Sequence, residues 1–200
     1  MIFKDRQEAG RKLSEKLSGQ NIDIIVSIPR GGVVVGREVS SKLKIPHKAI
    51  VVKKIAHPNY PELALGAISG KNIYWDENIL YDLKIPQEEI DFSLKKAQIK
   101  QEEYQRKFGK LPNVIGKTVC LVDDGVATGS TAILAAKILK DKGAKKVLLA
   151  VPVISADTRR DISSHFDSII ALFVPGSLTS VGQFYENFTQ VTDEDVVKTG

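Results

Sequence analysis

Five short apolar segments, each followed by a loop, constrain the fold of this chain more than any other feature of its sequence. They cover residues 22–28, 48–53, 118–122, 146–151 and 168–173. Short runs rich in β-branched residues indicate strands that are buried on both faces. Helical patterns separate most of these strands, and strands that alternate with helices form mainly parallel sheets with right-handed crossovers. The sequence therefore predicts an α/β fold, a mainly parallel twisted sheet with helices on both faces.

The middle of the chain interrupts this alternation. Residues 55–113 hold four of the eight prolines, a candidate strand at 63–68 and a long amphipathic helix predicted for 87–108. Near the start, Asp5 is a good N-cap for a helix that precedes the first strand. We therefore expect a single domain over residues 1–200 that carries an insertion, or lid, at about 55–113.

Composition and charge narrow the class of protein. A hydrophobic fraction of 42% and a charged fraction of 26% are typical of globular proteins. The net charge of +5 fits an anionic small molecule, and nucleic acid is disfavoured because no basic stretch is rich in aromatic residues. The apolar runs are about strand length, well short of the roughly 20 residues of a membrane span, so we expect no membrane association. We expect a cytoplasmic protein, because Cys120 is the only cysteine and the N-terminus lacks a signal-peptide core.

The segment 119–131 carries the chemistry that the sequence predicts. Its strand ends in the adjacent acids Asp123 and Asp124, and a short loop with Gly129 then begins a helix. The loop and the helix start also supply hydroxyl groups, from Thr128, Ser130 and Thr131. Backbone N–H groups at a helix N-terminus favour a phosphate monoester. The acids would repel that phosphate unless they face ribose hydroxyls or a Mg²⁺ ion shared with a pyrophosphate, so a phosphorylated sugar fits the segment best.

The same segment resembles the phosphoribosyl pyrophosphate signature of the type I phosphoribosyltransferases. In that signature an aliphatic strand, two acids and three variable residues precede Thr-Gly-x-Thr. The resemblance implies that the two acids hold the ribose hydroxyls and help to organise Mg²⁺, directly or through water, and that the loop wraps the 5-phosphate. The residues assigned to the ribose and the 5-phosphate are Asp123, Asp124, Ala127, Thr128, Gly129, Ser130 and Thr131. A buried strand before a well-capped helix is the alternative, but capping does not require two acids.

Two further loops follow strands and fit the same family. Pro29-Arg-Gly-Gly follows the first strand and resembles the family's pyrophosphate loop, in which a basic residue and glycines let the backbone approach the diphosphate. Two lysines end the second strand and are similar to the basic residues at the hinge of the family's lid. The residues assigned to pyrophosphate are Arg30, Gly31, Gly32, Lys53 and Lys54. Ligands of open α/β sheets bind outside the carboxyl ends of the strands, so these loops should converge with the acid pair. An exposed arginine in a turn and a solvated pair of lysines are the alternatives.

The resemblance covers roughly residues 20–55 and 115–175. It is closest to a branch of uncharacterised phosphoribosyltransferases that carry Pro-Arg-Gly-Gly and Asp-Asp-Gly-Val-Ala-Thr-Gly. Hypoxanthine-guanine enzymes usually have an aspartate where this chain has Ala127, which weakens a role in 6-oxopurine salvage and leaves adenine open. Gly125 replaces the usual aliphatic residue.

The resemblance implies a Mg²⁺-dependent glycosyltransferase, in which a nitrogen atom of a nucleobase-like acceptor displaces pyrophosphate from phosphoribosyl pyrophosphate. Neither the acceptor nor a general base can be assigned. The acceptor pocket is expected in the insertion or in the tail around Phe184 and Tyr185. Packing or a dimer contact is the first use expected for those two rings, and stacking on a base is the second. A homodimer therefore stays open.

Two other functions are alternatives to the transferase. A non-catalytic regulator that binds phosphoribosyl pyrophosphate or nucleotides on the same fold is the main alternative. A phosphorylated aspartate at Asp123, as in a phosphatase or receiver domain, fits poorly, because haloacid-type phosphatases have Asp-x-Asp after their first strand.

Overall fold

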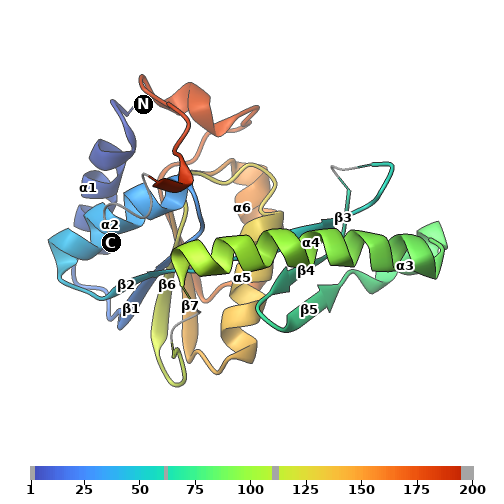
Figure 1. Ribbon diagram of the computed structural model, residues 1–200. Coiled ribbons are helices and arrows are strands. Elements are labelled where there is room, and N and C mark those ends of the chain that lie inside the picture. Colours follow the sequence, from blue (N-terminus) through green and yellow to red (C-terminus); the bar gives the residue numbers. More distant parts are fainter. Residues whose placement is uncertain (1–2, 61–62, 110–112, 195–200) are drawn as a thin grey trace. The chain divides into compact units, whose positions relative to one another are not determined.

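The computed structural model describes residues 3–60, 63–109 and 113–194. The chain divides into two compact units, the first formed by Met1–Ile50 with Pro112–Gly200 and the second by Val51–Leu111 (Figure 1). The second unit begins and ends close to the insertion predicted at 55–113. In the described part of the chain, no helix combines the length and the apolar character needed to cross a membrane.

The first unit contains the predicted parallel sheet. Its five strands lie in the order β2-β1-β6-β7-β8, and every neighbouring pair is parallel. Their bounds are β1 Ile24–Ser27, β2 His47–Ala49, β6 Thr118–Val122, β7 Lys146–Val153 and β8 Ser168–Phe173. From β1 the chain moves one way to β2, and from β6 it moves the opposite way to β7. The switch point of the sheet therefore lies between β1 and β6, where ligands of such sheets bind.

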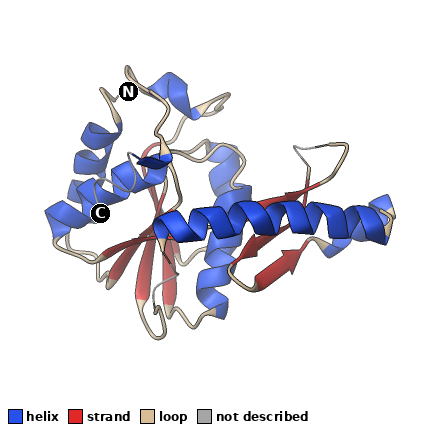
Figure 2. Ribbon diagram, viewed as in Figure 1, coloured by secondary structure: helices blue, strands red, loops and turns tan. Residues whose placement is uncertain are grey.

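Helices cover both faces of this sheet, as predicted (Figure 2). Right-handed crossovers that run in opposite directions put their helices on opposite faces. Thus α1 (Arg6–Leu17) and α2 (Gly31–Leu43) pack against each other on one face, and α5 (Ser130–Asp141) packs on β6 and β7. The short helices α6 (Ala156–Ile162) and η1 (Ser163–His165) precede β8. On the face of α1 and α2, Cys120 and Val122 of β6 join a core with Leu13 and Val35.

The second unit is an antiparallel sheet with helices. Its strands are β3 (Lys53–Ala56), β4 (Ala64–Ser69) and β5 (Asn72–Trp75), in that order, followed by α3 (Glu77–Leu83) and α4 (Gln87–Phe108). Helix α4 contacts β3 and β4, and Figure 2 shows it crossing this sheet. The predicted strand at 63–68 and the predicted helix at 87–108 are both present.

The strand predicted at 48–53 is wrong in its bounds. Strand β2 ends at Ala49, and Lys53 begins β3 in the other unit. The reason is the length of the neighbouring strand. β1 ends at Ser27, whose carbonyl accepts from the Ile50 amide, and the chain then turns at Pro29, so β1 offers no pairing partner to residues beyond 50.

The tail after β8 is fastened to the N-terminal segment. The Phe3 amide donates to the Phe184 carbonyl at 2.7 Å, and the Glu186 amide donates to the Phe3 carbonyl at 2.8 Å. The rings of Phe3 and Tyr185 lie 5.4 Å apart between centroids, and both residues are buried. The tail, which includes η2 (Val181–Phe184), thus returns from β8 to the start of α1.

Candidate functional site

Two adjacent acids stand at the carboxyl end of β6, the central strand. The Asp124 amide donates to Asp123 Oδ1 at 2.9 Å, and Arg6 Nε donates to Asp124 Oδ2 at 2.7 Å. The Arg6 and Asp124 side chains are only 9% and 15% exposed, so this ion pair is largely shielded from water. A shielded pair of this kind fixes the orientation of the carboxylate.

Burial raises the pKa of Asp123 well above its usual range, and the neighbouring carboxylate of Asp124 raises it further. The Asp124 amide hydrogen bond and the Arg6 charge oppose this shift without cancelling it. Two carboxylates this close share a proton readily unless a cation or hydroxyl donors compensate their charge. The acid pair therefore favours ligands that bring a cation or several hydroxyl groups.

The loop after β1 lies directly against the acid pair. A Cβ atom on Gly31 would overlap Asp124 Oδ2, and one on Gly32 would lie 2.8 Å from the Asp123 Cα atom. Only glycine permits this approach of the two loops. Arg30 is the residue before α2 and follows a cis peptide bond from Pro29, and its Nε lies 3.9 Å from Asp193 Oδ1 in the tail. The predicted convergence of Gly31 and Gly32 with the acids is thus visible in the structure.

The loop between the acids and α5 is held by its backbone. The Val126 amide donates to the Val153 carbonyl, and Thr158 Oγ1 donates to the Ala127 carbonyl at 2.7 Å. Gly129 is the N-cap of α5 in the left-handed conformation, with φ +82°. The residues around it are exposed, namely Ala127, Thr128, Ser130 and Thr131. This loop therefore offers hydroxyl groups beside the N-terminus of a twelve-residue helix, which is an arrangement suited to an anion.

The tail reaches the acid pair through Tyr185. Its phenol donates to the Asp124 carbonyl at 2.6 Å. Burial raises the pKa of Tyr185, and the charge of Asp124 adds to this effect, so the phenol stays a hydrogen-bond donor. Of the two uses weighed for Phe184 and Tyr185, packing within the chain is the one observed, since both rings join the cluster around Phe3.

Arg6 is a residue of the candidate site that the sequence did not predict. Besides its bond to Asp124, it donates from Nη1 to the Thr189 carbonyl at 2.9 Å. Its guanidinium carbon lies 3.8 Å from the centre of the Phe188 ring. An arginine directly after an N-cap is ordinarily a solvated helix residue, so the position of Arg6 next to Asp5 gave no sign of these contacts.

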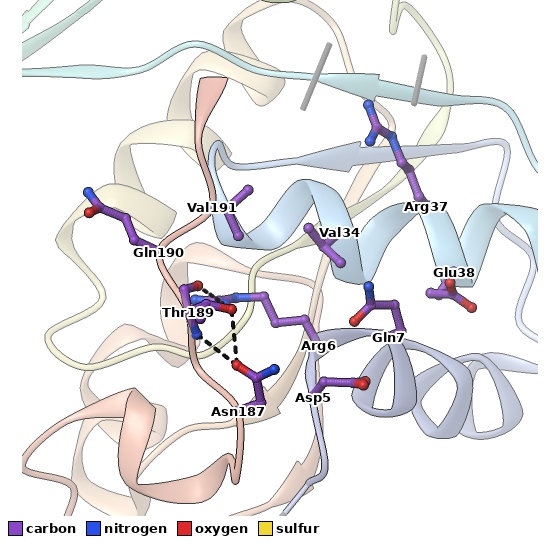
Figure 3. A pocket seen from close by; sticks show the side chains of 10 residues that line it. All are labelled: Asp5, Arg6, Gln7, Val34, Arg37, Glu38, Asn187, Thr189, Gln190 and Val191. Carbon is purple, nitrogen blue, oxygen red and sulfur yellow. Dashed lines mark hydrogen bonds between the residues drawn. The ribbon is translucent and has the colours of Figure 1, made fainter. Parts of the chain in front are cut away.

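A pocket of about 560 Å³ lies between α1, α2 and the tail (Figure 3). Arg6 lines it and so connects it to Asp124. Figure 3 shows amide side chains around the pocket, with Val34 and Val191 as apolar parts of its wall. The amide groups belong to Gln7, Asn187 and Gln190. Its volume lies in the range of small-molecule sites.

Lys53 and Lys54 belong to the second unit, so their predicted role toward pyrophosphate stays a prediction. The pleat of β3 separates the two side chains. Lys53 shares the inward face with buried Ile55, and its Nζ lies 3.1 Å from the centre of the Tyr104 ring of α4. Lys54 is exposed.

The acid pair suits Mg²⁺ only as a partial site. Among the residues that the structure describes, no three or more His, Cys, Asp or Glu side chains gather in a way that could hold a metal ion. Mg²⁺ commonly takes one or two carboxylates and completes its shell with water and substrate phosphates. Asp123 and Asp124, whose Oδ2 atom is already bound by Arg6, fit such a shared site.

Comparisons with known proteins agree with this geometry. The family model of the phosphoribosyl transferase domain matches residues 2–174. The protein Rv0571c of Mycobacterium tuberculosis, whose name assigns it provisionally to the phosphoribosyl transferases, is 35% identical over 204 residues. The match covers 98% of this chain and 46% of the relative, so the chain spans about half the length of that protein.

Two further relatives were found. An adenine phosphoribosyltransferase of Mycoplasmopsis agalactiae is 28% identical over 155 residues, covering 76% of this chain and 72% of the relative. The crystal structure of TT1426 from Thermus thermophilus superimposes with a TM-score of 0.85 at 33% identity. That superposition covers 99% of this chain and 97% of the other.

Proposed function

Because the chain belongs to the phosphoribosyl transferase family, we propose that it transfers a phosphoribosyl group to a nitrogenous base and releases pyrophosphate. The donor in this proposal is 5-phosphoribosyl 1-pyrophosphate. One observation carries it, the contact of Gly31 and Gly32 with Asp123 and Asp124. This contact supports the proposal, because a donor that carries both a ribose and a pyrophosphate needs the two loops close together.

Each part of the donor has its own binding groups in this proposal. The exposed hydroxyls of Thr128, Ser130 and Thr131 and the N-terminus of α5 bind the 5-phosphate. Asp123 and Asp124 accept hydrogen bonds from the ribose hydroxyls. Arg30 and the backbone of Gly31 and Gly32 bind the pyrophosphate, and a lysine of β3 adds charge there.

Catalysis in this proposal rests on charge. As the bond between the anomeric carbon and pyrophosphate breaks, positive charge develops on the ribose and negative charge on the leaving group. Asp123 and Asp124 stabilise the first, and Arg30 stabilises the second. Asp123 and Asp124 would hold Mg²⁺, in part through water, and the ion would supply positive charge that stabilises the leaving pyrophosphate.

The acceptor is proposed to lie in the pocket that Arg6 lines, since Arg6 also binds Asp124. Charged side chains of Asp5, Arg37 and Glu38 line the pocket together with its amides and two valines. This mixed lining suits a planar heterocycle that has nitrogen and oxygen atoms on its edge. The similarity to an adenine phosphoribosyltransferase makes adenine the first acceptor to test. We also propose a cytoplasmic location, consistent with the buried free thiol of Cys120, while a homodimer is left to direct measurement.

One assay tests the proposed function. The protein is incubated with Mg²⁺ and phosphoribosyl pyrophosphate against a panel of nucleobases, and pyrophosphate release is followed. The expected result is release that depends on one base and stops with EDTA. In Asp123→Asn with Asp124→Asn, donor affinity should fall at least tenfold, about 1.4 kcal/mol.

The matched control is Asp157→Asn with Asp161→Asn, which removes two exposed carboxylates from α6. It should leave donor affinity unchanged. Absence of donor binding by the wild-type protein would overturn the proposal. Tight donor binding without release on any base would instead identify a regulator on the same fold.

A further inference from the structure

Arg6 connects three segments that lie far apart in the sequence. It stands in the first turn of α1, binds Asp124 after β6, and donates to Thr189 in the tail. Its guanidinium plane also lies over Phe188. A largely buried arginine needs partners for its charge, and here the bonds to Asp124 and Thr189 both reach other segments.

The geometry divides the two oxygens of Asp124. Oδ2 accepts from Arg6 Nε and lies where a Cβ atom on Gly31 would be, so it is enclosed. Any ligand must therefore use Oδ1. Arg6 thus decides which face the Asp124 carboxylate presents to the donor.

The same side chain organises the tail along the pocket. Figure 3 shows Arg6 extending to Thr189, beside Asn187. Thr189 in turn donates from its hydroxyl and its amide to Asn187 Oδ1, at 3.0 and 3.2 Å. The guanidinium group therefore links these tail residues to the Asp124 side chain, whereas Tyr185 binds the Asp124 backbone carbonyl.

We propose that Arg6 is a positioning residue that couples the donor site to the tail: it presents Asp124 Oδ1 to the donor and holds residues 187–191 along the pocket. The donor half of this inference rests on the proposed function, whereas the coupling of Asp124 to the tail does not. Lysine cannot replace Arg6 fully, because only a planar fork binds two acceptors and stacks on a ring at once.

Amide hydrogen exchange of the ligand-free protein tests the coupling. Asp124→Asn should raise exchange at the amides of Glu186, Asn187 and Thr189 about tenfold, because the uncharged partner holds Arg6 less firmly. Arg6→Gln should do the same. Arg11→Gln is the control, since Arg11 lies on the same helix but is half-exposed and pairs with Glu38 at 3.6 Å. Unchanged tail exchange in Asp124→Asn would overturn the coupling, whatever the protein binds.

Donor affinity tests the other half, with phosphoribosyl pyrophosphate and Mg²⁺ as the probe. Arg6→Gln should weaken binding about tenfold, and Arg6→Lys should restore it to within about threefold while tail exchange stays raised. Phe188→Leu should raise tail exchange and leave donor affinity unchanged. If Arg6→Lys recovers both properties together, Arg6 supplies only charge and the proposal fails. If the wild type binds no donor, the proposed function fails, and the exchange result still decides the coupling.

Discussion

All five residues of β6 are buried, whereas β3 buries only Ile55 of its four. β6 has a parallel strand on each side, while β3 is the edge strand of a small antiparallel sheet. A strand that is buried on every side holds the residues after it in fixed positions, and Asp123 and Asp124 follow β6 directly. This difference indicates that the part of the candidate site with fixed positions, Asp123 and Asp124, belongs to the first unit. We therefore expect its chemistry to depend on the first unit far more than on the second.

The largest expected effect is on stability and separates the two cores. Leu121→Ala removes a fully buried side chain from β6 and should lower the free energy of unfolding by about 4 kcal/mol. Leu65→Ala in β4 should lower it by about 2–3 kcal/mol, because the smaller second core can relax. The two units can be followed separately in urea titrations. Trp75 is the only tryptophan, so its fluorescence reports on the second unit, whereas circular dichroism reports on both. In Leu65→Ala, the transition reported by Trp75 should occur at a lower urea concentration than the transition reported by circular dichroism. Coincident transitions in both variants would mean that the two units unfold as one.

Donor affinity should be weakened by a substitution in the first unit and not by a matched substitution in the second. Gly31→Ala places a methyl group on Asp124 Oδ2 and should weaken donor binding at least 100-fold, about 2.7 kcal/mol. Gly66→Ala places a methyl group on the Tyr74 carbonyl, so it should destabilise the second unit. Donor affinity, corrected for the folded fraction, should then stay within about threefold of the wild type, under 1 kcal/mol. Gly176→Ala is the control, since no atom lies within 4 Å of its added methyl. Equal losses for Gly31→Ala and Gly66→Ala would contradict the division.

The same contrast explains what the sequence could predict. The run 118–122 is continuously apolar because it is buried on both faces, and such runs are legible without a structure. The bounds of the strand predicted at 48–53 could not be read from the sequence, because they depend on where β1 ends and no longer pairs with β2. Local patterns report local structure, and pairing limits are set elsewhere in the chain.

The candidate site divides in the same way. Asp123, Asp124 and the glycines stand in short motifs after neighbouring strands, so their convergence could be predicted from the sequence. Arg6 could not, because its burial depends on Phe188 and Thr189, more than 180 residues away. A single charged residue in the first turn of a helix gives no sign of a partner at that distance.

Lowering the pH should destabilise the first unit through His47. His47 in β2 bonds to Ser27 Oγ at 2.9 Å, and burial, with the charges of Arg37 and Lys48, lowers its pKa to about 4. Because the folded pKa is below the unfolded value, the stabilising contribution is complete above about pH 6.5 and is lost as the pH falls toward 4. This loss should amount to roughly 1–3 kcal/mol. His47→Gln should remove that dependence, and His165→Gln, at an exposed position, should keep it. An unchanged pH profile in His47→Gln would show that other groups set it.

The smallest effect tests the second unit itself. Lys53 Nζ lies over the Tyr104 ring, so Lys53→Met should lower the stability reported by Trp75 by about 0.5–1 kcal/mol. Lys54→Met, on the opposite face of β3, should change it by less than about 0.5 kcal/mol. For donor affinity the order should reverse, because Lys53 is directed at α4 and Lys54 is exposed. Lys54→Met should therefore weaken binding a few-fold, about 0.5–1 kcal/mol, and Lys53→Met less. If Lys53→Met weakens donor binding more, Lys53 leaves Tyr104 when the donor binds, and the second unit contributes more to the site than β3 alone indicates.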